Sequence, residues 1–161
     1  PQSQLDLIRD HVAQGKPVIG IRTANHAFTL RNEASPAGHD QWPQWDREVF
    51  GGNYTGHHGN ELKTTVSFRH PDAIPDRLRA GIETQPFIAG GSLYQVAPLA
   101  DGAVVIMDGK VKDQPSEPIA WTFTRADGGK SFYTSLGHRD DFAGTVLPQL
   151  LRNAIDWSLQ R

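Results

Sequence analysis

The residues best suited to chemistry in this chain are its seven histidines, because its 161 residues include no cysteine. Imidazole has an ordinary pKa near neutrality, so a histidine can both accept and release a proton under physiological conditions. The absence of cysteine excludes disulfides, thiolate metal ligands and thiolate nucleophiles. The composition therefore favours acid–base chemistry by histidine.

Two histidines follow segments that have the pattern of buried strands. Residues 17–21 form a short apolar run that is followed by His26, and His138 comes after the strand-like residues 130–135 and before the last helix. Ligands of open α/β sheets bind beyond the carboxyl ends of the strands. His138 is therefore a candidate general acid or base, with His26 as its candidate partner. The structural alternatives are a helix cap or a backbone hydrogen bond for His138, and a bond to a neighbouring carbonyl for His26.

A glycine-rich loop over residues 51–60 contains the pair His57-His58. Glycine lets the backbone approach a ligand closely and adopt conformations that are closed to other residues. Adjacent side chains on an extended segment point to opposite sides, so one ring of the pair is expected to face the site. We assign His57 to catalysis and His58 to substrate binding. The alternative is a loop that turns for packing reasons and leaves both rings solvated.

Polar and aromatic side chains near these histidines are candidates for substrate binding. Arg22, Thr23 and Asn25 follow the first strand and would orient a ligand through hydrogen bonds. Trp42 and Tyr54 lie in or beside the polar loops, and their rings offer a stacking face to a sugar. The pattern favours a small carbohydrate-like ligand. The remaining tryptophans, Trp45, Trp121 and Trp157, fit the apolar faces of helices or strands and are expected in the core.

The sequence assigns no cofactor and no metal. Imidazole and carboxylate groups suit zinc or a similar divalent ion, and the carboxylates considered are Asp40, Asp46, Asp140 and Asp141. The tight ligand spacing of a motif such as HExxH is absent. A zinc site would therefore have to be assembled from distant loops, and it stays open only as an alternative.

Charge and hydropathy exclude several classes of partner. The formal net charge is −2, and both signs are scattered along the chain without a basic stripe. This pattern predicts neither a nucleic-acid partner nor attachment to a membrane surface. The longest apolar runs are far too short to span a bilayer, and the first residues lack the pattern of a signal peptide. Localisation stays undetermined.

The remaining pattern predicts one α/β domain over residues 1–161. Apolar residues at helical spacing predict an opening helix that Gly15 and Pro17 end, and a long closing helix over residues 145–159. We expect strands at 17–21, 63–68, 82–88, 103–107, 119–124 and 130–135, and a short helix at 43–50. The last two strands are joined by the turn sequence Ala126-Asp127-Gly128-Gly129, which is typical of an antiparallel hairpin.

Four motifs, taken in order, resemble the ThuA-like branch of the class I glutamine amidotransferase superfamily. They are KPVIGIRTANHAF at 16–28, GGNYTGHHGN at 51–60, PIAW at 118–121 with FYTSLGH at 132–138, and LRNAIDW at 151–157. In this comparison Arg22 stands where the amidotransferases have their nucleophilic cysteine, and His138 is similar in position to their catalytic histidine. Because that cysteine is missing, we expect no glutaminase activity.

The resemblance implies a fold and a substrate class. The fold is a flavodoxin-like three-layer sandwich with a mostly parallel sheet and a C-terminal antiparallel hairpin. The substrate is a carbohydrate derivative related to trehalose or to oxidised, 3-keto sugars. Two function classes follow: an enzyme of hydrolase or lyase type that works by histidine acid–base chemistry, or a non-catalytic sugar-binding or accessory module.

The resemblance also implies that strands precede the opening helix, and none does so in this chain. We therefore expect the N-terminal strands to be missing and the strand at 17–21 to have an unpaired edge. Either a further N-terminal segment or a second copy in a homo-oligomer would cover that edge. The alternative is a shortened variant whose sheet has rearranged.

Overall fold

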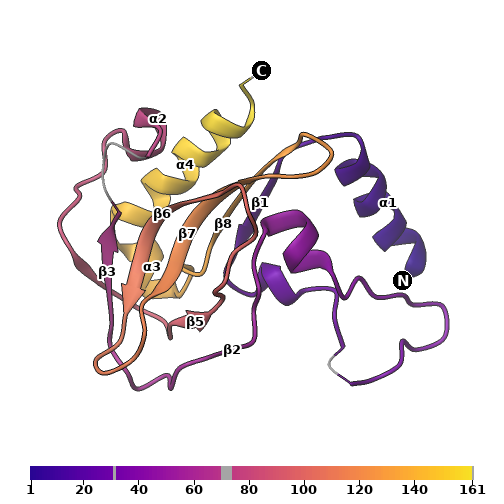
Figure 1. Cartoon of the computed structure of the whole chain (residues 1–161), viewed down its shortest axis with the longest axis horizontal. Coiled ribbons are helices and arrows are strands. Elements are labelled where there is room, and N and C mark those ends of the chain that lie inside the picture. Colours follow the sequence, from indigo (N-terminus) through magenta and orange to yellow (C-terminus); the bar gives the residue numbers. More distant parts are fainter. Residues whose placement is uncertain (31, 70–73, 161) are drawn as a thin grey trace.

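The computed structural model describes residues 1–30, 32–69 and 74–160. Its elements are, in chain order, α1 (Gln2–Ala13), β1 (Val18–Ile21), the 3₁₀ helix η1 (Arg22–His26), the π-helical turn η2 (Asp46–Phe50), β2 (Gly56–His57), β3 (Thr64–Phe68), α2 (Asp76–Arg79), β4 (Phe87–Ala89), β5 (Tyr94–Gln95), β6 (Ala103–Lys110), β7 (Glu117–Thr124), β8 (Lys130–Thr134), α3 (Arg139–Ala143) and α4 (Val146–Ser158). Figure 1 shows a curled sheet with α4 packed along it and α1 standing at the right of the view. Among the described helices, none is both long and apolar enough to cross a membrane.

The central sheet has six strands in the order β1-β8-β7-β6-β3-β4, and a separate small sheet pairs β2 with β5. Strands β1 and β8 are parallel, whereas the other four neighbouring pairs of the described six-stranded sheet are antiparallel. The mostly parallel sheet that we expected is therefore wrong, because the sheet is mixed. A parallel crossover needs a dozen or more residues, and the connections that join β6, β7 and β8 are too short to provide one.

Both faces of the sheet are covered, because side chains alternate between two apolar cores. On β7 and β8, Ala120 and Phe132 belong to the core that also contains Leu147 and Leu150 of α4. The neighbouring Trp121 and Tyr133 belong to the other core, with Val12 of α1 and with Trp45, Val49 and Phe50 in and beside η2. This alternation follows from the two-residue repeat of a strand.

Most predicted elements are present with shifted ends. The opening helix, the strand at 17–21, the strand at 63–68, the C-terminal hairpin and the closing helix are confirmed as α1, β1, β3, the β7–β8 pair and α4. The strand expected at 82–88 is the shorter β4 at 87–89, and the short helix expected from 43 is the turn η2. The elements β2, α2, β5 and α3 were not predicted, since two to five residues give no readable periodicity.

Strand β1 lies at an edge of the sheet. It pairs with β8 from Val18↔Ser131 to Ile21↔Thr134, and within the described residues no strand pairs with its other side. The expected unpaired edge is thus present. Two leucines of the outer helices are also largely exposed, Leu7 and Leu159, each at 69%. What covers this edge stays a prediction.

Candidate functional site

Arg22 occupies a strained position directly after β1. Its φ of 50° lies in the left-handed region, which costs free energy for any residue other than glycine. The Tyr133 hydroxyl donates to the Arg22 carbonyl at 2.5 Å, and Arg22 Nη1 donates to the Ser135 carbonyl at 3.3 Å. A Cβ at Gly91 would lie 2.4 Å from Arg22 Nη1, so glycine at this position leaves room for the guanidinium. Strain of this kind persists where the surrounding structure enforces it, and it often marks a functional site.

Arg22 and His138 line the same cavity, of about 350 Å³. The other lining residues are Asn60, Gly90, Gly91 and Ser92. Arg22 forms no ion pair with any residue that the structure describes, so its guanidinium keeps donors for a ligand. The cavity therefore combines an unpaired cation with an imidazole.

His138 is the N-cap of α3, as the structural alternative for this residue supposed. Its Nδ1 atom accepts a hydrogen bond from the Asp140 amide at 3.3 Å, and the Asp140 carboxylate lies 3.4 Å from the same atom. The side chain is still 37% exposed. Because both a donor and an acceptor face Nδ1, either neutral tautomer is supported. Nε2 can accordingly present either a proton or a lone pair to a ligand.

The backbone around His138 is held by the buried carboxylate of Asp141. One of its oxygens accepts from the Gly90 amide at 2.7 Å, and the other accepts from the amides of Gly137 and His138, both at 2.9 Å. A Cβ at Gly90 would lie 2.8 Å from His138 Nδ1. The carboxylate therefore fixes both walls of the cavity, the loop after β4 and the start of α3.

Tyr94 joins the cavity to three other candidate residues. The Arg22 Cζ atom lies 5.3 Å above the Tyr94 ring, and the ring centroids of His26 and His57 lie 6.0 and 6.2 Å from the Tyr94 centroid. Tyr54 lies 4.9 Å from Tyr94 and stacks on His26 at 4.3 Å with an interplanar angle of 11°. Burial raises the pKa of Tyr94, so its hydroxyl stays protonated and can donate. Tyr94 thus brings Arg22, His26, Tyr54 and His57 into one cluster.

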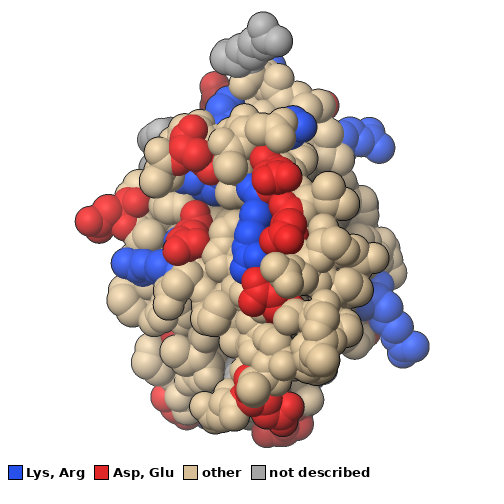
Figure 2. All heavy atoms as spheres, turned by 90° about the vertical axis from the view of Figure 1, so that its right-hand side faces the viewer, with Lys and Arg blue, Asp and Glu red and all other residues tan. Residues whose placement is uncertain are grey.

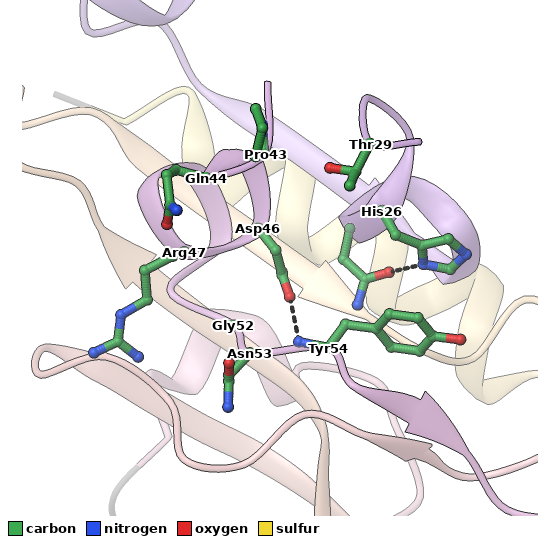
Figure 3. Close-up of a pocket in the computed structure, with 10 residues that line it drawn as sticks. His26, Thr29, Pro43, Gln44, Asp46, Arg47, Gly52, Asn53 and Tyr54 are labelled. Carbon is green, nitrogen blue, oxygen red and sulfur yellow. Dashed lines mark hydrogen bonds between the residues drawn. The ribbon is translucent and has the colours of Figure 1, made fainter. Parts of the chain in front are cut away.

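A second cavity of about 350 Å³ lies beside this cluster, where η1, η2 and the glycine-rich loop meet (Figure 3). His26, Asp46 and Tyr54 line it together with Asn25 and Gly52. Asp46 Oδ2 accepts from the Tyr54 amide at 2.7 Å, and a contact of 2.7 Å joins the Asn25 Oδ1 and His26 Nδ1 atoms. Burial raises the pKa of Asp46 to about 6, although its backbone hydrogen bond and the nearby Arg47 act in the opposite direction.

Three predicted site residues lie outside these contacts. Trp42 lines neither cavity and packs on Trp45, with its Nε1 donating to Glu48 Oε2 at 2.6 Å. Thr23 is exposed. His58 is half-buried, and its backbone carbonyl lies 2.7 Å from His57 Nδ1. Their roles in binding stay predictions.

The sequence missed Tyr94, Asn60 and Ser92, and it considered Asp46 only as a metal ligand. Tyr94 belongs to a two-residue strand that pairs His57 with Tyr94, and this pairing has no sequence signature. Within the residues that the structure describes, no group of three histidines or acidic residues is placed to hold a metal ion.

Comparisons with known proteins agree with this geometry at the level of the fold. A family model described as ThuA, trehalose utilisation, matches residues 1–158. A putative ThuA-like protein from Bacteroides uniformis is 17% identical with a TM-score of 0.69, over 97% of this chain and 63% of that chain. A cold-adapted β-galactosidase from Rahnella sp. R3 is 15% identical with a TM-score of 0.61, over 96% of this chain and 20% of that chain. Among curated proteins no match was found. The chain thus spans less than two thirds of either structural neighbour.

Proposed function

Since the chain belongs to the ThuA family, whose description is trehalose utilisation, we propose that the cavity between Arg22 and His138 binds a carbohydrate derivative and that His138 exchanges a proton with it. The observation that carries this proposal is the partly exposed imidazole of His138 in the same cavity as an unpaired guanidinium. Imidazole supplies a proton or a lone pair, and guanidinium stabilises negative charge that develops on an oxygen.

A 3-keto sugar is the derivative that uses both groups. Removal of a proton from the carbon beside the carbonyl breaks a C–H bond and moves the electron pair to the carbonyl oxygen, where Arg22 would stabilise it. The proton passes to His138 Nε2, in the tautomer whose Nδ1 donates to the Asp140 carboxylate and no longer accepts from the Asp140 amide. When the electrons return, an oxygen substituent two carbons from the carbonyl leaves and takes up that proton from Nε2. The outcome is an elimination of lyase type.

The aromatic cluster beside the cavity supports a sugar ligand. Tyr54 and Tyr94 offer ring faces of the kind that pack on the C–H face of a pyranose. His26 and His57 lie at the two edges of this cluster and would hold hydroxyl groups. In this proposal His138 transfers the proton, and His26 and His57 assist by orienting the substrate or relaying the proton.

The experiment compares wild-type protein with His138→Gln on trehalose and on trehalose oxidised at C3, with products followed by NMR. We expect turnover of the keto sugar by the wild type and a loss of about 10²- to 10⁴-fold in His138→Gln, with binding of the sugar retained. The variant His39→Gln, at an exposed turn, is the control and should behave as wild type. Binding without turnover in the wild type would instead identify a non-catalytic sugar-binding module.

A further inference from the structure

Two residues that line the cavity beside η2, Asn25 and Asp46, each have a buried hydrogen-bonding atom without a partner among the described residues. Asn25 is 1% exposed, and its Nδ2 atom has no hydrogen-bond partner among the described residues. The same is true of Asp46 Oδ1 within the described part of the chain. Buried polar groups are nearly always satisfied in folded proteins, so such a pair calls for a ligand or a water molecule.

Both side chains are oriented by their other polar atom. The contact between Asn25 Oδ1 and His26 Nδ1 turns the amide nitrogen of Asn25 away from the histidine. The hydrogen bond from the Tyr54 amide to Asp46 Oδ2, drawn as a dashed line in Figure 3, leaves Oδ1 for another partner. A Cβ at Gly52 would clash with Asp46 Oδ1, so glycine at this position leaves room for the carboxylate.

The two unpartnered atoms have opposite hydrogen-bonding character, which selects the chemistry of the ligand. Asn25 Nδ2 can only donate, whereas an ionised Asp46 Oδ1 can only accept. A metal ion or an ammonium group cannot accept from the amide, and an anion would face the carboxylate. A hydroxyl group both donates and accepts through a single oxygen, so one hydroxyl group that reaches both atoms would satisfy them.

The remaining walls suit a neutral sugar. Tyr54 lines this cavity beside the polar pair, and one face of its ring is stacked on His26. A volume of about 350 Å³ lies within the range of small-molecule sites. The lining thus combines an aromatic residue with a hydrogen-bond donor and an acceptor.

We propose that this cavity is a neutral-sugar subsite in which one ring hydroxyl donates to Asp46 Oδ1 and accepts from Asn25 Nδ2. The proposal deepens the proposed function, on which it rests for its class of ligand, and adds a second point of recognition to the Arg22–His138 cavity. Asp46 has a binding role here, and His138 transfers the proton elsewhere.

The test uses methyl α-D-glucopyranoside and its four monodeoxy analogues, which lack the hydroxyl at C2, C3, C4 or C6. Affinities are measured by NMR titration at pH 8, where a carboxyl with a pKa of about 6 is ionised. We expect one analogue to bind about 10- to 100-fold more weakly than the parent, as for the loss of a hydrogen bond to a charged group. In Asp46→Asn, which replaces the acceptor with a donor, the parent should lose a similar factor and the difference between parent and analogue should shrink below threefold.

A control variant and the wild-type series together make the test decisive. Asp101→Asn makes the same chemical change at an exposed turn and should retain the full difference between parent and analogue. The series on the wild-type protein needs no variant, so it decides the matter even if Asp46→Asn does not fold. Absence of binding by the parent sugar, equal affinity for all five compounds, or full selectivity in a folded Asp46→Asn would each overturn the proposal.

The test is independent of catalysis at His138. The titrations measure binding and not turnover, so the result does not depend on proton transfer by His138. If the proposed turnover fails while this selectivity stands, the subsite remains and only the proton-transfer role falls. If turnover stands and the selectivity fails, the subsite alone is lost.

Discussion

At the scale of single residues, the site is built from side chains held in costly states. Arg22 has a left-handed backbone conformation, burial raises the pKa of the Asp46 carboxyl, and His138 Nδ1 lies close to both an amide and a carboxylate. The backbone of Arg22 and the raised pKa of Asp46 each lower stability, and the side chains of all three residues line a cavity. Features that oppose folding but suit binding are expected at functional sites.

Replacing Arg22 isolates the cost of its backbone. Glycine adopts a φ of 50° without the clash that a Cβ introduces, so Arg22→Gly should be more stable than Arg22→Ala by about 1 kcal/mol. Both variants should lose ligand binding, because both lack the guanidinium. The control compares alanine with glycine at position 24. There the glycine variant, Ala24→Gly, should be less stable by roughly 0.5 to 1 kcal/mol, which is the opposite sign to that expected at position 22. Urea unfolding measures both, and equal stability of the two Arg22 variants would show that no strain is stored there.

Asp46 makes the stability of the protein depend on pH. Its folded pKa of about 6 lies above the ordinary value near 3.8, so its contribution is fully present below pH 4 and is lost as pH rises through 6. The groups that face it are Arg47, the Tyr54 amide and Tyr133. Asp46→Asn cannot titrate, so its stability relative to wild type should rise by roughly 2 to 3 kcal/mol between pH 4 and pH 8. A relative stability that stays constant over this range contradicts a raised pKa.

At the scale of elements, the site depends on the anchoring of β1 between α1 and the C-terminal hairpin. Arg125, only 3% exposed, leaves the end of β7 and donates to the Lys16 carbonyl at 2.7 Å and to Ser131 Oγ at 2.9 Å. It also pairs with Asp127 in the hairpin turn at 3.1 Å. One side chain thus ties the hairpin to the segment that leads into β1, and β1 in turn positions Arg22.

Removal of this anchor should be far more damaging than removal of a surface pair. Arg125→Ala leaves buried carbonyl groups and Asp127 without their donor, and we expect a loss of roughly 3 to 5 kcal/mol in the free energy of unfolding. The matched control is Arg79→Ala, which breaks an exposed pair with Asp76 and should cost less than about 1 kcal/mol. Denaturant titrations compare the two, and similar losses would mean that Arg125 is not an anchor.

Elements with a readable repeat were predictable from the sequence, and those that complete the site were not. Apolar residues at helical spacing, such as Val12 and Leu150, indicated α1 and α4. The alternation of side chains indicated β3, and the turn sequence before β8 indicated the hairpin. Tyr94 reaches the site through a two-residue pairing with β2, and Asp46 through its place on a single π-helical turn. Such short elements are set by tertiary contacts, which no local pattern encodes. The mostly parallel sheet was expected from the family resemblance and from the succession of helices and strands, and that succession does not reveal strand order.

At the scale of the whole molecule, the surface mixes charges of both signs. Figure 2 shows lysine and arginine side chains beside acidic ones on the face that carries α1. On this helix Arg9 pairs with Asp6 at 3.0 Å and with Asp40 at 2.7 Å, and the pair with Asp40 lowers the pKa of that carboxyl. The view shows no broad basic surface. This face therefore offers no extended positive surface that would attract a polyanion.

The open edge of β1 predicts association of this 161-residue chain. Unpaired backbone groups on an edge strand are a template for pairing with another strand. We expect sedimentation velocity to show an associating species as concentration rises, with amides of Val18–Ile21 protected from hydrogen exchange in that species. Pairing through this edge is contradicted if the chain stays monomeric at about 0.1 mM and its β1 amides exchange rapidly.

Binding of a carbohydrate derivative between Arg22 and His138 is the proposal on which the catalytic role of His138 depends. The most direct measurement is a crystal structure of the His138→Gln variant with trehalose oxidised at C3, because the slowed variant should retain the uncleaved sugar. We expect the keto oxygen within hydrogen-bonding distance of the Arg22 guanidinium, the adjacent carbon facing the side chain at position 138, and a sugar ring against Tyr94. A sugar bound elsewhere, or a cavity that stays free of ligand at saturating concentration, would contradict it.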